Sequence, residues 1–150
     1  MSKWDDRFMA MAEHIANWSK DESTKIGAVV VGEDHQILAT GYNGPPRGVD
    51  DDVPERKVRP AKYLYTAHAE ANAVYNAARE GVSLDGCTMY ISGLPPCNTC
   101  AHAIIQCGIR EIVVQTLEYP ERWAEFILPA MEMLMEADVT ICVHNPGDGE

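Results

Sequence analysis

The chain has 150 residues, the length of one ordinary domain, and its 46% of hydrophobic residues is enough for a core. Its formal net charge of −11 repels a nucleic-acid backbone, so we expect no polynucleotide partner. No apolar run approaches the roughly 20 residues of a membrane-spanning helix, and residues 1–6 lack the plan of a signal peptide, so we expect one cytoplasmic domain, residues 1–150, with no membrane partner.

The first half of the chain predicts a helix, a hairpin and a long loop. Apolar residues at spacings of three and four predict a helix over residues 4–19, with Ser2 as its cap. Two short apolar runs, 26–31 and 36–42, flank a polar turn and predict an antiparallel hairpin. Residues 43–66 show no periodicity, and so long an irregular segment is usually functional or mobile.

This irregular segment is rich in positive charge. Two interpretations stay open, a phosphate-binding lid and a solvated surface loop. It holds five of the chain's twelve basic residues: Arg47, Arg56, Lys57, Arg59 and Lys62.

In the second half, predicted helices and strands alternate. Pro129 interrupts the apolar face of residues 120–136, which predicts a short turn followed by a separate helix that starts near this proline. Alternation of strands and helices favours parallel neighbours joined by right-handed crossovers. We therefore expect an α/β fold, a three-layer α/β/α sandwich on a mixed five-stranded sheet whose last strand is parallel to its neighbour. The other predicted elements are helices over 67–80 and 97–107 and strands over 87–92, 111–115 and 139–144.

Three residues at the starts of two predicted helices have the chemistry of zinc ligands. His68 begins one helix, and Cys97 and Cys100 begin the next, where their spacing places both sulfurs on one side. Helix N–H groups help to hold thiolates, and two such helix starts can meet at the ends of adjacent parallel strands. Because catalytic zinc keeps three protein ligands and leaves the fourth position to water, we expect a catalytic zinc ion here.

Glu70, two residues after His68, makes the predicted site catalytic. Two thiolates and a neutral imidazole cancel the charge of zinc, so that bound water is less acidic than at a three-histidine site. A carboxylate beside that water can take its proton and pass it on. The pattern H-x-E…P-C-x-x-C is the signature of zinc nucleobase deaminases, in which the glutamate is the general acid/base. Each half alone is weak, but both halves in this order are specific.

Two other kinds of site could use the same residues. A structural zinc site would need a fourth protein ligand, and His102 would point away from the two sulfurs on a helix. A thiol redox pair at Cys97 and Cys100 is a further alternative, which a metal measurement decides. We expect surface or hydrogen-bonded histidines at 14, 35, 102 and 144, and core thiols at Cys87, Cys107 and Cys142.

The chain resembles the cytidine deaminase-like superfamily and, within it, the deoxycytidylate deaminase family. The resemblance extends from about residue 4 to 143. The metal motif is shared by the whole superfamily, whereas the Gly-Tyr-Asn-Gly stretch points to the deoxycytidylate branch. The matching stretches are residues 26–31, 41–44 with 46–48, 68–73, 96–101 and 104–109.

The resemblance implies zinc-dependent hydrolysis of dCMP to dUMP and ammonia, which supplies dUMP for thymidylate synthesis. A zinc-activated water attacks C4 of cytosine, and Glu70 carries its proton to N3 and then to ammonia. The resemblance also implies that Asn43 faces the nucleotide, that the Ala69 N–H meets the base, and that Tyr119 packs nearby. The alternative for Tyr119 is an aromatic residue that covers a sheet edge. Because no spare histidine–cysteine cluster is evident, we expect one zinc ion per subunit.

A nucleotide monophosphate needs a positive anchor. The candidates are Lys25 with Ser23 and Thr24, Arg122, and Arg47, and the sequence does not rank them. The resemblance further implies a homohexamer that dCTP activates and dTTP inhibits, with Mg²⁺ beside the effector nucleotide. The predicted effector site lies in the loop 43–62 and includes Gly44, Arg47, Asp51 and Asp52.

Related functions are disfavoured by single features. The net charge argues against a tRNA adenosine deaminase, the length leaves no room for the reductase domain of a riboflavin-pathway enzyme, and free-nucleoside cytidine deaminases commonly have cysteine at the position of His68. Two alternatives stay open: a deaminase of dCTP or CMP, and a zinc-stabilised nucleotide-binding regulator without turnover.

Overall fold

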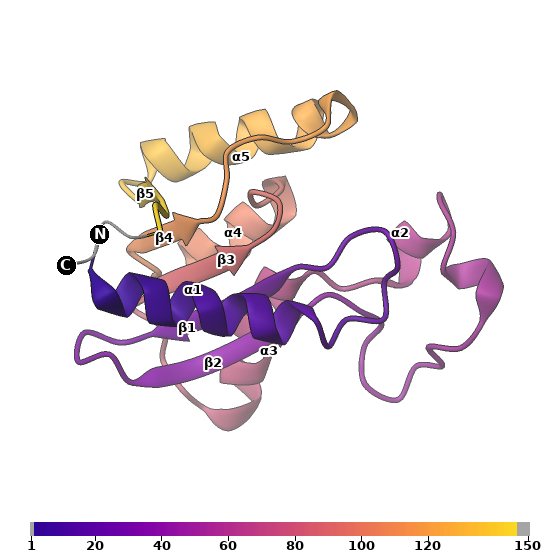
Figure 1. Cartoon of the computed structure of the whole chain (residues 1–150), viewed down its shortest axis with the longest axis horizontal. Helices are drawn as coiled ribbons and strands as arrows, with labels where there is room; N and C mark the ends of the chain where they lie inside the picture. The colour runs from indigo at the N-terminus through magenta and orange to yellow at the C-terminus, as the bar shows by residue number, and fades with distance from the viewer. Residues whose placement is uncertain (1, 147–150) are drawn as a thin grey trace.

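A computed structural model describes residues 2–146 and shows one mixed five-stranded sheet with strand order β2-β1-β3-β4-β5 (Figure 1). β1 pairs antiparallel with both β2 and β3, while β3, β4 and β5 are parallel. The prediction of a mixed sheet with a parallel last strand is therefore confirmed. The strands are β1 (Gly27–Val31), β2 (Ile37–Tyr42), β3 (Thr88–Ser92), β4 (Glu111–Val114) and β5 (Thr140–Val143).

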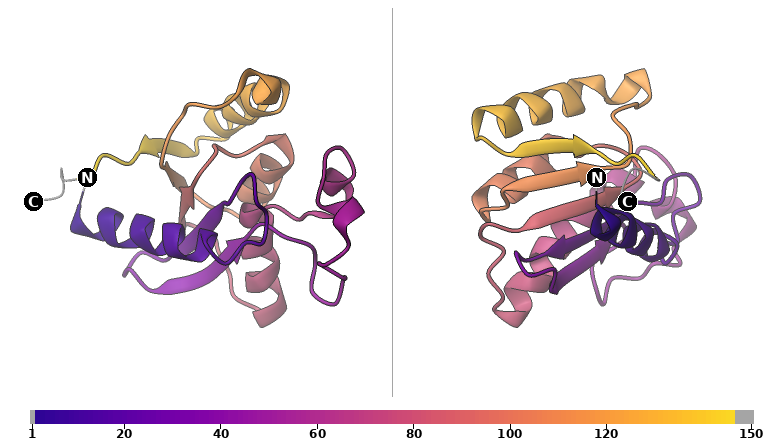
Figure 2. Two further views of the ribbon diagram at one scale, coloured as in Figure 1. Left: turned by 45° about the vertical axis from the view of Figure 1, so that its right-hand side comes forward. Right: turned by 60° about the vertical axis from the view of Figure 1, so that its left-hand side comes forward.

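The helices form the outer layers of the sandwich. In the left view of Figure 2, α1 lies on one side of the sheet and α3, α4 and α5 lie on the other. The three-layer prediction is therefore confirmed. The α-helices are α1 (Lys3–Ala16), α2 (Lys62–Tyr65), α3 (Ala69–Glu80), α4 (Asn98–Gln106) and α5 (Ala124–Glu136), with short 3₁₀ helices at Pro54–Arg56 and Glu121–Trp123.

The central strands are apolar because both of their faces are covered. Successive side chains of a strand point to opposite faces, so Val29 and Val31 of β1 pack with α1. Ala28 and Val30 pack in the larger core on the other face. All five residues of β1 are buried, which explains why the strand is a continuous apolar run without alternation.

The first helix begins as the sequence predicts. The Ser2 hydroxyl accepts a hydrogen bond from the Asp5 N–H at 3.3 Å, and the Asp5 carboxylate accepts one from the Ser2 N–H at 2.8 Å. This reciprocal pair satisfies two N–H groups that have no partner within the helix. The helix ends at Ala16, three residues before the predicted end.

Helix α5 corrects the prediction of a break at Pro129. The helix runs unbroken from Ala124 to Glu136, and only the segment before it is a separate 3₁₀ turn. Proline removes one N–H bond to the residue four positions earlier, and here that residue, Glu125, is exposed, so water can satisfy its carbonyl. Buried Ile127 and Leu134, on either side of the proline, hold the helix against the core.

The long segment after β2 closes on itself. The backbones of Gly44 and Ala67 exchange two hydrogen bonds, at 3.0 and 2.9 Å, so the segment leaves and re-enters the fold at one point. Between these residues it contains η1 and α2, and Figure 1 shows it extending from one end of the molecule. Among residues 2–146, no helix has both the length and the apolar character needed to span a lipid bilayer.

Candidate metal centre and active-site cavity

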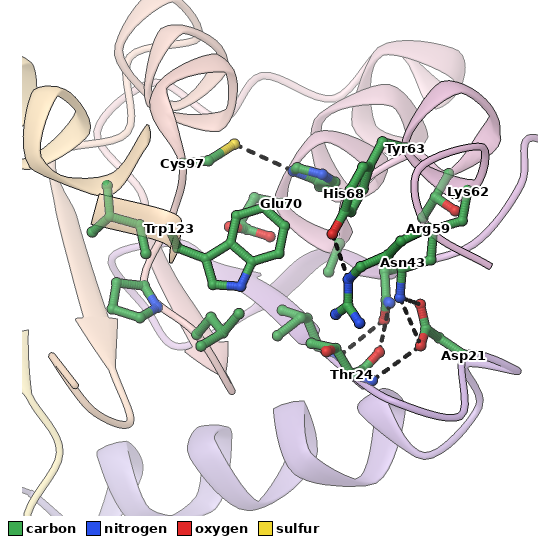
Figure 3. A pocket seen from close by; sticks show the side chains of 16 residues that line it. Asp21, Thr24, Asn43, Arg59, Lys62, Tyr63, His68, Glu70, Cys97 and Trp123 are labelled. Carbon is green, nitrogen blue, oxygen red and sulfur yellow. Dashed lines mark hydrogen bonds and ion pairs between the residues drawn. The ribbon is translucent and has the colours of Figure 1, made fainter. Parts of the chain in front are cut away.

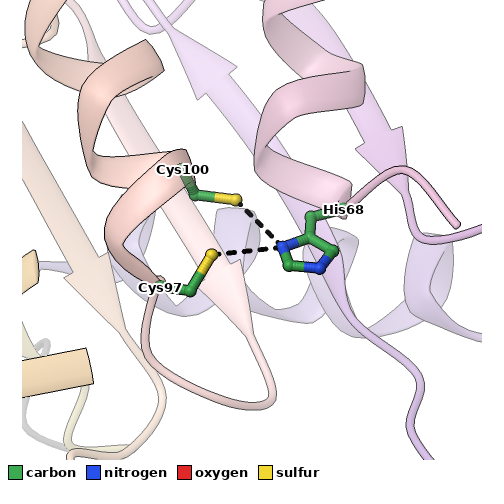
Figure 4. Close-up of side chains that lie close together, drawn as sticks. All are labelled: His68, Cys97 and Cys100. Atoms are coloured by element: carbon green, nitrogen blue, oxygen red, sulfur yellow. Dashed lines mark hydrogen bonds between the residues drawn. The ribbon is translucent and has the colours of Figure 1, made fainter. Parts of the chain in front are cut away.

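Three side chains from two helix starts converge at one end of the sheet. His68 is the N-cap of α3, Cys97 is the N-cap of α4, and Cys100 lies in the first turn of α4. The His68 Nδ1 atom lies 3.3 Å from each of the two sulfurs (Figure 4). The sequence predicts this convergence of residues that are 29 and 32 positions apart, and the structure shows it.

The donor set and its protonation suit zinc. Hydrogen bonds from the Cys100 thiol and then from His68 and Thr99 overcome burial and lower the pKa of Cys97 to about 3. The hydrogen bond with Cys97 and burial raise the pKa of Cys100, so the pair holds one thiolate that is ready to accept a cation. Two sulfurs and one imidazole nitrogen match a three-ligand zinc site with one open position.

Glu70 lies in the first turn of α3, beside these ligands. Its side chain is only 4% exposed and lines the same cavity as His68 and Cys97. Burial raises the pKa of Glu70 to about 7, against the opposing effect of His68. A carboxyl group with a pKa near neutrality can both accept and donate a proton, as a general acid/base must.

A cavity leads from His68 and Cys97 to the segment around α2 (Figure 3). One wall is apolar and aromatic, and the side opposite Cys97 is polar. The apolar wall comprises Ile26, Leu94, Pro95, Trp123 and Ile127, and the polar side comprises Asp21, Thr24, Asn43, Arg59, Lys62, Tyr63 and Thr66.

Two of the predicted substrate residues, Asn43 and Ala69, line this cavity. The Asn43 amide donates to the carbonyl of Thr24 at 2.9 Å and accepts from the N–H of Ile26 at 2.9 Å. Both ends of this side chain are therefore held by the backbone that enters β1. Asn43 shapes the wall of the cavity through these two bonds.

The other three predicted substrate residues do not line the cavity. Lys25 is exposed and donates a hydrogen bond to the carbonyl of Ser19. The exposed Arg122 lies over the ring of Trp123, 5.6 Å from its centroid. Tyr119 is half-buried in the loop after β4, and Trp123, four residues later, occupies the cavity wall.

The predicted effector residues are divided between two sites. Gly44 and Asp51 line a second cavity, which adjoins the first and shares Arg59 and Lys62 with it. Asp51 and Asp52 lie beside Lys20, at 2.9 and 3.9 Å. Arg47 lies elsewhere, in a surface hollow with Asn76 and Arg79.

Four residues that line the cavity are not specifically predicted as site residues by the sequence: Arg59, Lys62, Tyr63 and Trp123. The basic segment 43–66 was a signal for Arg59 and Lys62, although it did not separate them from their basic neighbours. Tyr63 and Trp123, whose rings meet edge to face at 5.5 Å, had no signal. Their contact depends on two segments that are 60 residues apart and meet only in the fold.

Comparisons with known proteins agree with this geometry. The sequence model of the cytidine and deoxycytidylate deaminase zinc-binding region matches residues 2–116. An uncharacterised deaminase from the luxG 3′ region of Aliivibrio fischeri is 41% identical, with 94% of this chain and 93% of that protein covered. Human deoxycytidylate deaminase is 41% identical, with 78% of this chain and 67% of that protein covered.

Solved structures include a dCMP deaminase of the cyanophage S-TIM5. Its crystal structure in complex with dCMP and dUMP matches with a TM-score of 0.76 and 27% sequence identity, covering 93% of this chain and 95% of that chain. The apo form of the same enzyme matches with a TM-score of 0.73.

Proposed function

The chain belongs to the family of the cytidine and deoxycytidylate deaminase zinc-binding region, and from this premise we propose that it hydrolyses dCMP to dUMP and ammonia. The observation that carries the proposal is the cluster of His68, Cys97 and Cys100 with buried Glu70 beside it in one cavity. Relatives named deoxycytidylate deaminase support the choice of substrate, and so does the cyanophage enzyme that was crystallised with dCMP and dUMP.

The chemistry divides between the metal and the protein. His68, Cys97 and Cys100 would hold the zinc ion, which would supply an activated water as the nucleophile at C4 of cytosine. Glu70 accepts a proton from this water and delivers a proton to N3. It then assists proton transfer to the departing amino group, which leaves as ammonia. A carboxyl group whose pKa lies near 7 can serve in each of these steps because both of its protonation states are accessible.

The cavity wall orients the base. Trp123, Leu94 and Ile127 provide flat and apolar contacts suited to a cytosine ring, and they exclude bulk water from the reacting atoms. Ala69 is the first residue of α3, so its N–H has no partner within the helix and is suited to donate to the base carbonyl.

Finer features stay predictions. We expect a homohexamer, a cytoplasmic location, and regulation by dCTP and dTTP with Mg²⁺. The second cavity, with Gly44 and Asp51 beside basic residues of the segment 43–66, is the proposed place of the effector. The position of Arg47 outside this cavity gives it no direct part in that proposal.

The test is ammonia release from a panel of substrates: dCMP, CMP, dCTP and deoxycytidine, each with and without added dCTP or dTTP. We expect the highest kcat/KM with dCMP. A preference for CMP or dCTP would replace the proposed substrate, and absence of turnover with all four by the zinc-loaded protein would favour a nucleotide-binding regulator. Equal turnover of deoxycytidine and dCMP would contradict a phosphate anchor.

A further inference from the structure

Two cations line the active-site cavity on the side opposite Cys97. They are Arg59 and Lys62, both from the segment that closes at Gly44 and Ala67 (Figure 3). A phosphate group attached to the sugar of a bound nucleotide needs a positive partner on such a side, away from the ring that reacts. The surroundings of the two cations differ, and this difference decides between them.

Lys62 already has a full set of partners. Its side chain is 9% exposed, and its Nζ atom lies 3.1 and 3.4 Å from the two oxygens of Asp21 and 2.9 Å from the Ser23 hydroxyl. An ammonium that is matched by a carboxylate contributes little net charge to the cavity. Lys62 therefore ties α2 to the loop before β1 and positions the neighbouring side chains.

Arg59 is different because its charge has no matching carboxylate within residues 2–146. Its Nε atom donates to the hydroxyl of Tyr63, which fixes the side chain and leaves the two terminal nitrogens for a ligand. In Figure 3 the guanidinium lies between Tyr63 and Asn43. A guanidinium presents paired N–H groups that match the geometry of phosphate oxygens.

The negative charge of Asp21 in the same cavity is largely matched. Besides Lys62, its carboxylate accepts from the N–H groups of Ser23 at 2.9 Å and Thr24 at 3.0 Å. Among the described residues that line the cavity, Arg59 is therefore the positive group without an acidic partner, in a protein whose net charge is −11. The cations that the sequence pointed to, Lys25 and Arg122, lie outside the cavity lining.

We propose that Arg59 anchors the 5′-phosphate of the substrate, held in place by Tyr63 and by the Lys62–Asp21 pair. This inference rests on the proposed function and adds the residue that distinguishes a nucleotide from its nucleoside. In this proposal Arg59 contacts the phosphate of the ligand, whereas Lys62 and Asp21 position α2.

The experiment compares kcat/KM for dCMP and for deoxycytidine in the zinc-loaded parent protein and in Arg59→Gln. We expect Arg59→Gln to lower kcat/KM for dCMP by roughly 10- to 100-fold, the effect of one lost charge-assisted bond, chiefly through KM. The value for deoxycytidine is expected to change little, because that substrate has no phosphate. A loss confined to the phosphorylated substrate is a result that a general structural defect would not produce.

Two further variants serve as comparisons. Arg110→Gln removes the same charge from an exposed arginine that lies 3.9 Å from Glu33 and precedes β4, so it controls for the change in net charge. Arg122→Gln tests the anchor that the sequence suggested. The proposal is overturned if Arg59→Gln keeps the parental ratio of dCMP to deoxycytidine turnover, or if Arg122→Gln alone lowers that ratio.

Failure of the proposed function would look different. In that case the parent protein would release no ammonia from dCMP, and the anchor is then tested by calorimetric binding of dCMP to the parent and to Arg59→Gln. Weaker binding to Arg59→Gln supports the anchor even without turnover. Equal binding of dCMP to the two proteins contradicts it.

Discussion

The proposed role of Glu70 depends on the burial of its side chain. A glutamate in the first turn of an exposed helix would be ionised at neutral pH, whereas this one is 4% exposed and its pKa is raised to about 7 by burial. Its position two residues after His68 places it beside the predicted metal ligands, and it is not a member of that group. The residue is therefore suited to transfer protons. Its replacement should lower the rate of the reaction without removing the metal.

We expect Glu70→Gln to keep its zinc and to lose roughly 10²- to 10⁴-fold in kcat, the usual contribution of a general acid/base. The measurements are zinc content by atomic absorption and ammonia release from dCMP. Glu80→Gln, at the exposed end of the same helix, is the matched control and should retain activity. A turnover near the parental rate in Glu70→Gln would exclude the proton-transfer role.

At the scale of elements, the position of the predicted metal ligand His68 depends on how closely α3 approaches β2. A Cβ atom at Gly41 would lie 2.3 Å from the Ala69 carbonyl oxygen and 2.4 Å from the Ala73 nitrogen. The first turn of α3, which follows His68 and carries Glu70, thus rests directly on the backbone of the strand. Gly27 in β1 allows the same close approach of α1 on the other face, with 2.0 Å to the Ala12 oxygen.

Gly41→Ala is expected to destabilise the protein by about 1–3 kcal/mol, because the backbone of α3 must move to admit a methyl group. The same movement displaces His68, so the affinity for zinc should fall as well. Urea unfolding and a competitive zinc titration measure the two effects. Gly44→Ala is the control, since a Cβ atom there meets nothing within 4 Å, and unchanged stability of Gly41→Ala would contradict the close packing.

A second contact between elements is the ion pair of Lys62 and Asp21, which joins α2 to the loop before β1. Burial raises the pKa of Asp21, but hydrogen bonds from Thr24, Ser23 and Lys62 outweigh it and leave the pKa below its ordinary value. Because the folded pKa lies below the unfolded one, the stabilisation by this carboxylate is complete above the unfolded pKa. It is lost as the pH falls through the folded pKa.

Asp21→Asn is therefore expected to lose about 1–3 kcal/mol at pH 7, where it leaves the buried ammonium of Lys62 without its partner. The difference from the parent should shrink as the pH falls below about 4, because the unfolded parent then binds a proton that the folded carboxylate does not, and it should be smallest once the folded carboxyl is protonated as well. Urea unfolding at a series of pH values tests this. The exposed Asp34→Asn is the control, and a difference that stayed constant with pH would contradict the ion pair.

At the scale of the whole molecule, the cluster of His68, Cys97 and Cys100 brings together two separate connections, one between β2 and β3 and one between β3 and β4. His68 belongs to the helix that packs on β2, and Cys97 and Cys100 belong to the helix that follows β3. A ligand that binds only the folded arrangement stabilises it by mass action. Zinc should therefore act as a cross-link between α3 and α4 as well as a catalyst.

Removal of zinc with a chelator is expected to abolish deamination and to lower the melting temperature by roughly 5–10 °C. Added zinc should restore both, and added magnesium should restore neither. Calorimetry and an ammonia assay on the same samples test these expectations. A protein that is zinc-free as purified and contains a Cys97–Cys100 disulfide would support the redox alternative instead.

Sequence alone predicted the candidate metal site, and it determined the order of the five strands and the four longer helices. The motif is local, with Glu70 two residues from His68 and Cys100 three residues from Cys97. The His68 part begins α3 and the Cys97 part begins α4. Apolar runs and helix periodicity likewise specified the mixed sheet and its parallel last strand. These signals come from residues that are close in sequence, so they can be recognised without knowledge of the fold.

Only the tertiary structure decided which cations and aromatic rings reach the cavity and whether α5 continues through Pro129. Lys62 is neutralised by Asp21 from 41 positions away, and this pairing leaves Arg59 as the available charge. Pro129 stays helical because apolar contacts on both sides of it outweigh one missing bond. Such outcomes depend on contacts between distant segments, and the irregular segment 43–66 has no periodicity from which they could be inferred.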